Sequence, residues 1–223
     1  MNQTILVAFA AVMAANCAAL AASPNSVSFS ADKKIVYANH AVRSYVPLPA
    51  HSPTHTTIFD NLATLDPQGV YMDGTGYTIG GPDSATGQIW LAAAFTPTAN
   101  ATVTEVDVAA GFVEGTKNSV VVGVYADASG IPGQLLWSGN AKLPTFGDCC
   151  AVATLTDKAG LPITAGTQYW VGITTPSTGT DTFAAWSFNV ADQIDSGVSA
   201  ENQGSGWVAG TSLPPVAFAV FGK

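Results

Sequence analysis

Basic side chains are scarce in this sequence. Its 223 residues include 7 lysines and arginines against 15 aspartates and glutamates, which gives a formal net charge of -8 at pH 7. Proteins that bind nucleic acid or anionic membrane surfaces need clustered positive charge to neutralise phosphates. The composition therefore argues against both kinds of partner and agrees with a protein of the extracellular space or periplasm.

Histidine is absent after residue 55, because the three histidines are His40, His51 and His55. Catalysis of the Ser-His-Asp or Cys-His kind needs a histidine, or a substitute base, beside the nucleophile. The residues after 55 would have to borrow one from the N-terminal segment. The sequence also lacks a Gly-x-Ser-x-Gly turn, a phosphate-binding loop and a zinc-type Cys/His cluster. We therefore expect that the protein is not an enzyme.

The histidine pair with helical metal-site spacing is His51 and His55. Pro53 lies between them and would break the helix that this spacing requires. We expect no metal site there.

Cysteine is nearly absent as well, with Cys17 in the N-terminal segment and an adjacent pair, Cys149 and Cys150. Adjacent Cα atoms lie about 3.8 Å apart, which is less than a disulfide normally spans. A strained vicinal disulfide, two thiols on opposite faces of a strand, and intermolecular pairing remain open alternatives. None of these can link distant loops, so the fold must be stabilised by its core.

The first 22 residues carry no charged side chain, and residues 5–22 are apolar or small. Ala19-Leu20-Ala21 has the small-x-small pattern of a signal peptidase site, so we predict a signal peptide over residues 1–22. The protein would then be secreted, or periplasmic, and free of the membrane after cleavage. A retained anchor and a lipoprotein modified at Cys17 are the alternatives.

The segment 23–56 has one acid, Asp32, against three bases, and it contains several prolines. We predict an extended basic arm with one strand over residues 34–39. Residues 57–223 are predicted to form the folded domain.

After the leader no window has a sustained helical period. Short β-rich runs are instead separated by clusters of turn residues, at 57–62, 88–95, 102–113, 118–139, 149–156, 167–175, 182–190 and 216–221. This pattern predicts an all-β fold, an antiparallel two-sheet sandwich.

The run over residues 118–139 is a predicted hairpin around which the other strands are arranged. Its loop, residues 127–133, contains Gly130, Pro132 and Gly133, which supply the backbone angles of a chain reversal. Asp127 and the loop carbonyls are a candidate calcium site because calcium prefers oxygen ligands. Calcium is the one cofactor that the sequence suggests, although a single carboxylate is a small ligand set.

Residues 102–113 alternate in polarity, with Val103, Glu105 and Asp107 assigned to one face. Glu105 and Asp107 would lie at the distance of a glycosidase carboxylate pair. The alternative is an ordinary solvated strand face.

Five tryptophans offer surface for stacking on sugar rings. Three stand inside apolar runs and are expected in the core: Trp90, Trp137 and Trp170. Trp186 and Trp207 have polar or glycine neighbours and are the predicted ligand-binding aromatics. Asn189 and Asp192 are candidates to bond sugar hydroxyls.

Several motifs recur in this order in one group of proteins: Phe95-Thr-Pro, the run from Val120 to Leu136, Gly-Thr-Gln-Tyr-Trp170, and a closing Gly-Trp-Val before Ala-Phe-Ala-Val-Phe-Gly. Over about residues 57–222 the chain resembles the jelly-roll β-sandwich domains of secreted bacterial exoproteins of the choice-of-anchor and PEP-CTERM type. The resemblance implies a jelly-roll fold and export, and the family has no agreed catalytic residues. The chain differs from anchored members in lacking their Pro-Glu-Pro signal, C-terminal helix and basic tail, which argues against surface sorting by that route.

The sequence as a whole predicts an exported, non-catalytic protein of extracellular binding or adhesion, with polysaccharide as the candidate ligand. The alternative is a structural exoprotein that assembles with itself into a surface layer or matrix. A secreted glycoside hydrolase comes third.

Overall fold

The computed structural model describes residues 26–39, 55–62, 71, 74–148, 152–189, 199–210 and 215–223. The predicted signal peptide, His51, the Cys149–Cys150 pair and Asp192 lie outside the described residues. In the part of the chain that the structure describes, no helix has the length and apolar character needed to cross a membrane.

The described residues form fifteen β-strands and no α-helix. A five-stranded sheet has the order β1 (Ser26–Phe29), β2 (Ile35–Asn39), β4 (Thr75–Gly80), β12 (Phe183–Ser187) and β7 (Ala110–Glu114). A four-stranded sheet has the order β10 (Ala153–Ile163), β6 (Ala101–Val108), β15 (Phe218–Gly222) and β3 (Thr56–Asp60). A six-stranded sheet has the order β14 (Val208–Ala209), β13 (Ser199–Asn202), β5 (Trp90–Phe95), β11 (Tyr169–Thr174), β8 (Ser119–Asp127) and β9 (Pro132–Lys142).

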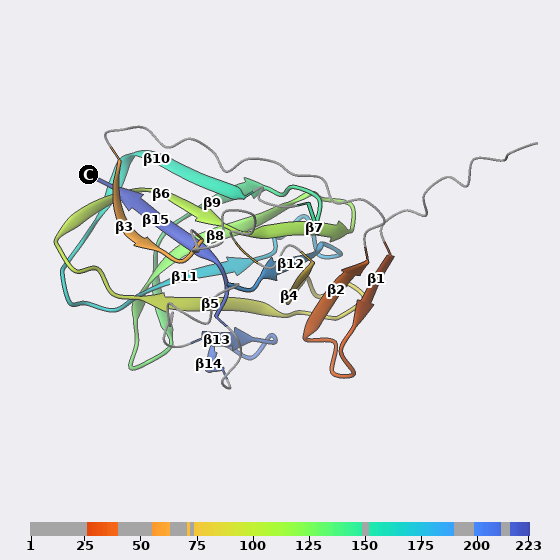
Figure 1. Cartoon of the computed structure of the whole chain (residues 1–223). Helices are drawn as coiled ribbons and strands as arrows, with labels where there is room; N and C mark the ends of the chain where they lie inside the picture. Colours follow the sequence, from red (N-terminus) through yellow and green to blue (C-terminus); the bar gives the residue numbers. More distant parts are fainter. Residues whose placement is uncertain are drawn as a thin grey trace, which may run out of the picture.

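The neighbouring strands of these sheets run antiparallel. In Figure 1 β10, β15 and β3 lie along one side of the body, and β5, β13 and β14 lie along the other. The predicted all-β antiparallel sandwich is confirmed. Its jelly-roll order stays a prediction.

The five-stranded and four-stranded sheets meet at three backbone hydrogen bonds. Ala109 N donates to Ala217 O (3.0 Å), Ala217 N donates to Ser187 O (2.9 Å), and Ser187 N donates to Ala109 O (2.8 Å). These bonds join the two sheets into one layer, and the six-stranded sheet forms the opposite layer. We call this contact the layer junction.

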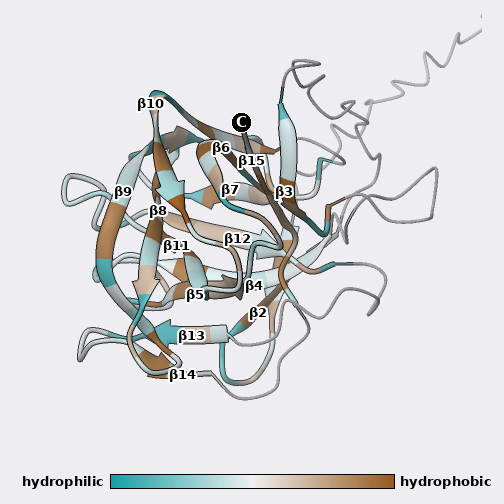
Figure 2. Cartoon of the chain, turned by 90° about the vertical axis from the view of Figure 1, so that its left-hand side faces the viewer, coloured by the Kyte–Doolittle hydropathy of each residue, from teal (hydrophilic) through white to brown (hydrophobic). Residues whose placement is uncertain are grey.

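The main core fills the space between the layers and draws on all three sheets. In β8, every second residue, Val120, Val122 and Val124, is fully buried, as expected for a strand with one face on the core. Hydrophobic and hydrophilic stretches alternate along β9 and β10 in Figure 2. The strand period therefore sets which side chains enter the core.

Buried polar side chains complete the layer junction. Trp186 Nε1 donates to Ala217 O over 2.9 Å. The fully buried Asn61 donates from Nδ2 to Val216 O (2.9 Å) and accepts at Oδ1 from Phe218 N (2.7 Å). Because buried backbone groups need partners, these side chains permit the irregular backbone at the entrance to β15.

The predicted arm over residues 23–56 is wrong for residues 26–39, which belong to the folded body. The strand expected at residues 34–39 is present as β2, and it pairs with β4 through Ile35↔Tyr77 and its neighbours. Lys34 Nζ also forms a 2.8 Å ion pair with Glu201 Oε2 on β13. Asp32, Lys33 and Lys34 lie in the β1–β2 turn, so these three charges do not mark a free arm.

The strand predicted over residues 102–113 is interrupted at Ala109, where the chain passes from β6 to β7. Val103 was assigned to the face of Glu105, and this is wrong because Val103 lies in the main core with Val106. The pairing register with β15 shifts between Phe221, which lies opposite Glu105, and Gly222, which lies opposite Val103. Such a β-bulge moves one side chain to the other face.

We predict that Asn61→Ala destabilises the protein by about 3 kcal/mol, because it leaves Val216 O and Phe218 N buried without their side-chain partner. Urea unfolding followed by far-UV circular dichroism would measure the change. The control is Asn140→Ala on β9, whose side chain is exposed; it should change stability by less than about 0.5 kcal/mol. Equal losses in the two variants would contradict a structural role for Asn61.

Candidate functional site

The outer face of the six-stranded sheet carries a second apolar cluster, separate from the main core. It consists of Ala92, Ala94, Tyr125, Trp170 and Ala200. Trp207, from the loop between β13 and β14, packs against this cluster from outside. The cluster itself is buried, whereas Trp207 stays partly exposed, and a partly exposed aromatic on a sheet face is a candidate binding site.

Two glycines explain how Tyr125 lies on this face. Gly123 of β8 and Gly172 of β11 are cross-strand partners. A Cβ at Gly172 would lie 2.7 Å from the Tyr125 ring, and a Cβ at Gly123 would lie 3.0 Å from it. Only glycine at these positions lets the ring rest against the backbone of both strands.

Trp207 extends this surface toward solvent. Its ring meets the Tyr125 ring edge-to-face, with the centroids 5.8 Å apart and the planes at 73°, a favourable aromatic geometry. Trp207 is half-buried, whereas Leu135, the β9 partner of Tyr125, is 45% exposed. We call Tyr125, Trp207 and Leu135 the aromatic platform.

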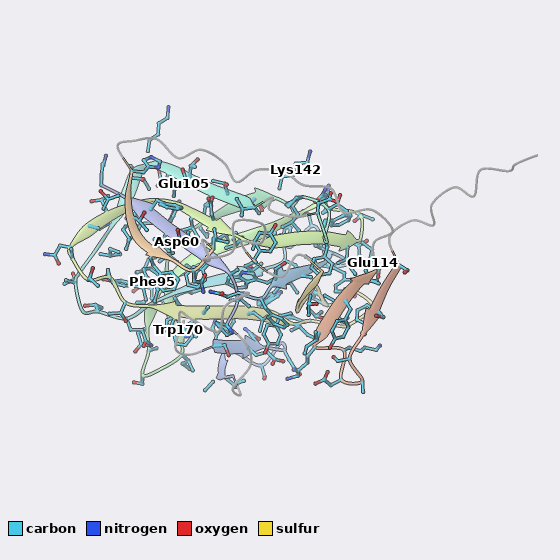
Figure 3. The ribbon with its side chains drawn as sticks, viewed as in Figure 1. Asp60, Phe95, Glu105, Glu114, Lys142 and Trp170 are labelled. Carbon is cyan, nitrogen blue, oxygen red and sulfur yellow. The ribbon has the colours of Figure 1, made fainter. Side chains whose placement is uncertain are left out.

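Trp170 is the β11 partner of Tyr125 and is fully buried. Figure 3 shows it on the side of the body where β5 and β13 lie, away from Glu105 on the opposite side. Its indole Nε1 donates to Asp127 Oδ1 over 2.9 Å. The same oxygen accepts from Gln168 Nε2 (2.8 Å) and Gly130 N (3.1 Å).

Asp127 therefore organises the loop that the sequence identified as a candidate calcium site. The hydrogen bond from Trp170, followed by those from Gly130 and Gln168, lowers the pKa of the Asp127 carboxyl below its ordinary value. Among the described residues no group of three or more His, Cys, Asp or Glu side chains could hold a metal ion. Calcium binding by Asp127 and the loop carbonyls stays a prediction.

Two of the predicted ligand-binding residues are not on the surface. Trp186 is fully buried and Asn189 is 4% exposed. Trp186 belongs to the layer junction, and Asn189 Nδ2 donates to Asn61 O over 2.8 Å. The assignment of both residues to a wet surface is wrong because their polar atoms are satisfied by backbone carbonyls inside the fold.

The three tryptophans expected in the core differ in their environment. Trp170 is fully buried, although in the outer cluster. Trp137 is half-buried and packs against the main core. Trp90 is also half-buried, and its Nε1 donates to Thr175 Oγ1 over 3.2 Å.

Glu105 and Asp107 share one face of β6, as the glycosidase hypothesis requires, but they differ in access. Asp107 is fully buried and accepts at Oδ1 from Thr154 Oγ1 over 2.6 Å. Glu105 lies on a surface depression of about 400 Å³, where its Oε2 is 3.7 Å from His55 Nδ1. Because Asp107 does not line this depression, the geometry does not favour a mechanism that pairs Glu105 with Asp107.

Comparisons with known proteins add no assignment. No protein-family model matches the chain, and a search of curated proteins found no significant match. The resemblance to secreted exoprotein domains remains a prediction from the sequence.

Trp207 and Asp127 were predicted from their sequence neighbours, whereas Tyr125, Leu135 and Gln168 were not. Gly123 and Gly172 each interrupt a β-rich run. Glycine inside a strand often marks a site where another group closely approaches the backbone. That signal indicated the place of the platform without identifying the ring that occupies it.

The indole proton of Trp170 should report the titration of Asp127. Because the folded-state pKa is lowered, this carboxylate stabilises the fold above its unfolded pKa of about 3.8, and the contribution is lost as pH falls through the lower folded value. In NMR spectra the Trp170 Nε1–H resonance should move with a midpoint below pH 3.8 in the native protein, and the movement should vanish in Asp127→Asn. A midpoint at or above the ordinary value would contradict the hydrogen-bond geometry.

Proposed function

We propose that this protein is an exported, non-catalytic binding protein that holds polysaccharide on the outer face of its six-stranded sheet. The observation that carries the proposal is the aromatic platform, in which Trp207 is fixed edge-to-face on Tyr125 yet remains half-exposed beside Leu135. Sugar rings combine apolar C–H faces with hydroxyl edges. They are suited to a surface that offers an aromatic body beside hydrogen-bonding groups.

Polar groups continue from the platform along β9. Ser138 is the cross-strand partner of Gly123, and Asn140 is the partner of Val121, so both belong to the outer face. Their side chains are exposed. From Leu135 to Asn140 the strand spans about 17 Å, a length suited to an extended polymer with its hydroxyls against the serine and asparagine.

The charge of the chain favours a neutral polymer. With a formal net charge of -8 at pH 7, the protein repels polyanions at long range. Uncharged glycans are therefore the proposed ligands, ahead of uronic acid or sulfated polymers.

The proposal keeps three expectations from the sequence. Export rests on the leader predicted at residues 1–22. The jelly-roll order of the strands and the extracellular role in binding or adhesion rest on the resemblance to secreted exoprotein domains.

Self-assembly is the second candidate function, and the edge of the five-stranded sheet supports it. β1 is the outermost strand of that sheet, with Phe29 38% exposed, and Tyr37 on β2 is 39% exposed. An exposed edge strand can pair with another copy of the chain.

Trp207→Ala should weaken binding to neutral polysaccharide by about tenfold or more, because the variant loses an apolar stacking surface worth roughly 1.5–3 kcal/mol when buried. Affinity electrophoresis through gels that contain xyloglucan, galactomannan or β-glucan, with and without calcium, would measure this. Tyr37→Ala is the control, since it removes an exposed aromatic from a different sheet, and it should bind like the parent.

If the folded parent is retained by none of these gels, the proposal is contradicted. Unchanged binding by Trp207→Ala would contradict it as well. If the parent instead sediments as larger species at higher concentration and Phe29→Ala prevents it, self-assembly is supported.

A further inference from the structure

A second concave site lies at one end of the sandwich. The β8–β9 and β10–β11 connections lie at the same end of the body in Figure 1. There a cleft of about 550 Å³ opens between the six-stranded sheet and β10 of the four-stranded sheet. Its volume is typical of small-molecule sites.

The walls of this end cleft are apolar. Leu136 and Tyr169 line it from the six-stranded sheet, and Leu161 and Pro162 line it from β10. The Tyr169 ring is fixed, because its hydroxyl accepts from Thr164 N over 3.0 Å and its ring packs on Phe95 with the centroids 5.9 Å apart. The walls are therefore largely preformed.

The polar groups of the end cleft lie together at its rim. Thr167 and Gln168 provide a hydroxyl and an amide, and Asp127 provides one carboxylate. No basic residue lines the cleft among the described residues. The rim is therefore an acceptor site with a single negative charge.

The Asp127 carboxylate is most open to another donor at Oδ2. Three donors converge on Oδ1, whereas among the described residues Oδ2 only shares the Gly130 N–H, at 3.2 Å. Each carboxylate oxygen offers about two acceptor positions, so the second position of Oδ2 is the one that a ligand ammonium would use. The donors on Oδ1 also hold the carboxylate in place, so a charged ligand group would meet a preorganised partner.

We propose that the end cleft binds a small molecule that has an apolar body and one ammonium group. The body packs between Leu136, Leu161 and Pro162, and the ammonium donates to Asp127. The net charge of -8 raises the local concentration of cations. A sugar fits this cleft less well than it fits the platform. Leu136, Leu161 and Pro162 offer no aromatic face, and Tyr169 is the one aromatic side chain among the wall residues that the structure describes.

The experiment is an NMR titration of the whole protein with three probes that share one carbon chain: n-hexylammonium, hexan-1-ol and hexanoate at pH 7. The ammonium should bind about three- to fivefold more tightly than the alcohol, the range of an exposed ion pair, and the carboxylate should bind least. The amide resonances that shift should include those of Leu161 and Thr167.

Two variants separate the apolar and charged parts of the site. Leu161→Ala should weaken the ammonium and the alcohol alike, by about fivefold to tenfold. Asp127→Asn should make the ammonium and the alcohol bind equally. The matched control is Asp181→Asn, which removes a loop carboxylate that is likewise held by hydrogen bonds, from Thr116, and it should bind all three probes like the parent. Trp207→Ala should also leave probe binding unchanged.

Because Asp127→Asn could disturb its loop, the parent protein provides an independent readout. Its affinity for hexylammonium should fall as pH drops through the Asp127 titration, while its affinity for hexanol stays constant. Equal binding of the three probes, or full binding by Leu161→Ala, would overturn the proposal. Displacement of hexylammonium by oligosaccharide with shifts at the cleft resonances would assign the cleft to sugar instead and overturn it as well.

Discussion

The carbonyl oxygen of Ala217 accepts two hydrogen bonds, from Ala109 N and from Trp186 Nε1, and the two-layer architecture depends on this point. Here β6 passes into β7, and the ends of β12 and β15 meet. Without these bonds the five-stranded and four-stranded sheets would present unpaired backbone groups to the core, at a cost of several kcal/mol. The Trp186 side chain is therefore held inside the fold by this bond and is not available to a ligand.

The outer face of the six-stranded sheet is organised by the packing of aromatic rings on glycine backbone. The glycine pair Gly123–Gly172 leaves space for the Tyr125 ring, and burial raises the pKa of its hydroxyl. Trp170, on the neighbouring strand, is anchored to Asp127, and Trp207 packs against the cluster from outside. A rigid aromatic surface loses little conformational freedom on binding, which is why this face supports a binding function better than the Glu105 depression does.

The sequence pattern was sufficient for the fold class and for the β8–β9 hairpin, because strand period and turn residues are local signals. It failed for Trp186, whose polar neighbours Ser187 and Asn189 indicated a wet surface. Those neighbours are buried because their polar groups bond the backbone of distant segments, a fact that local composition does not contain. The same limit hid the pairing of β2 with β4 and the burial of Asp107 under Thr154. For Trp207 local composition was more informative, since its glycine and polar neighbours belong to an exposed loop, although the ring itself is half-buried.

The most direct test is to follow the indole Nε1–H resonances of the five tryptophans by NMR while neutral oligosaccharides are added. If the platform binds glycan, the Trp207 resonance shifts and saturates, while those of Trp186 and Trp137 stay in place. Saturable shifts confined to Trp137 or Trp90, or no shift at any indole up to millimolar ligand, would contradict the assignment of the binding surface to the aromatic platform.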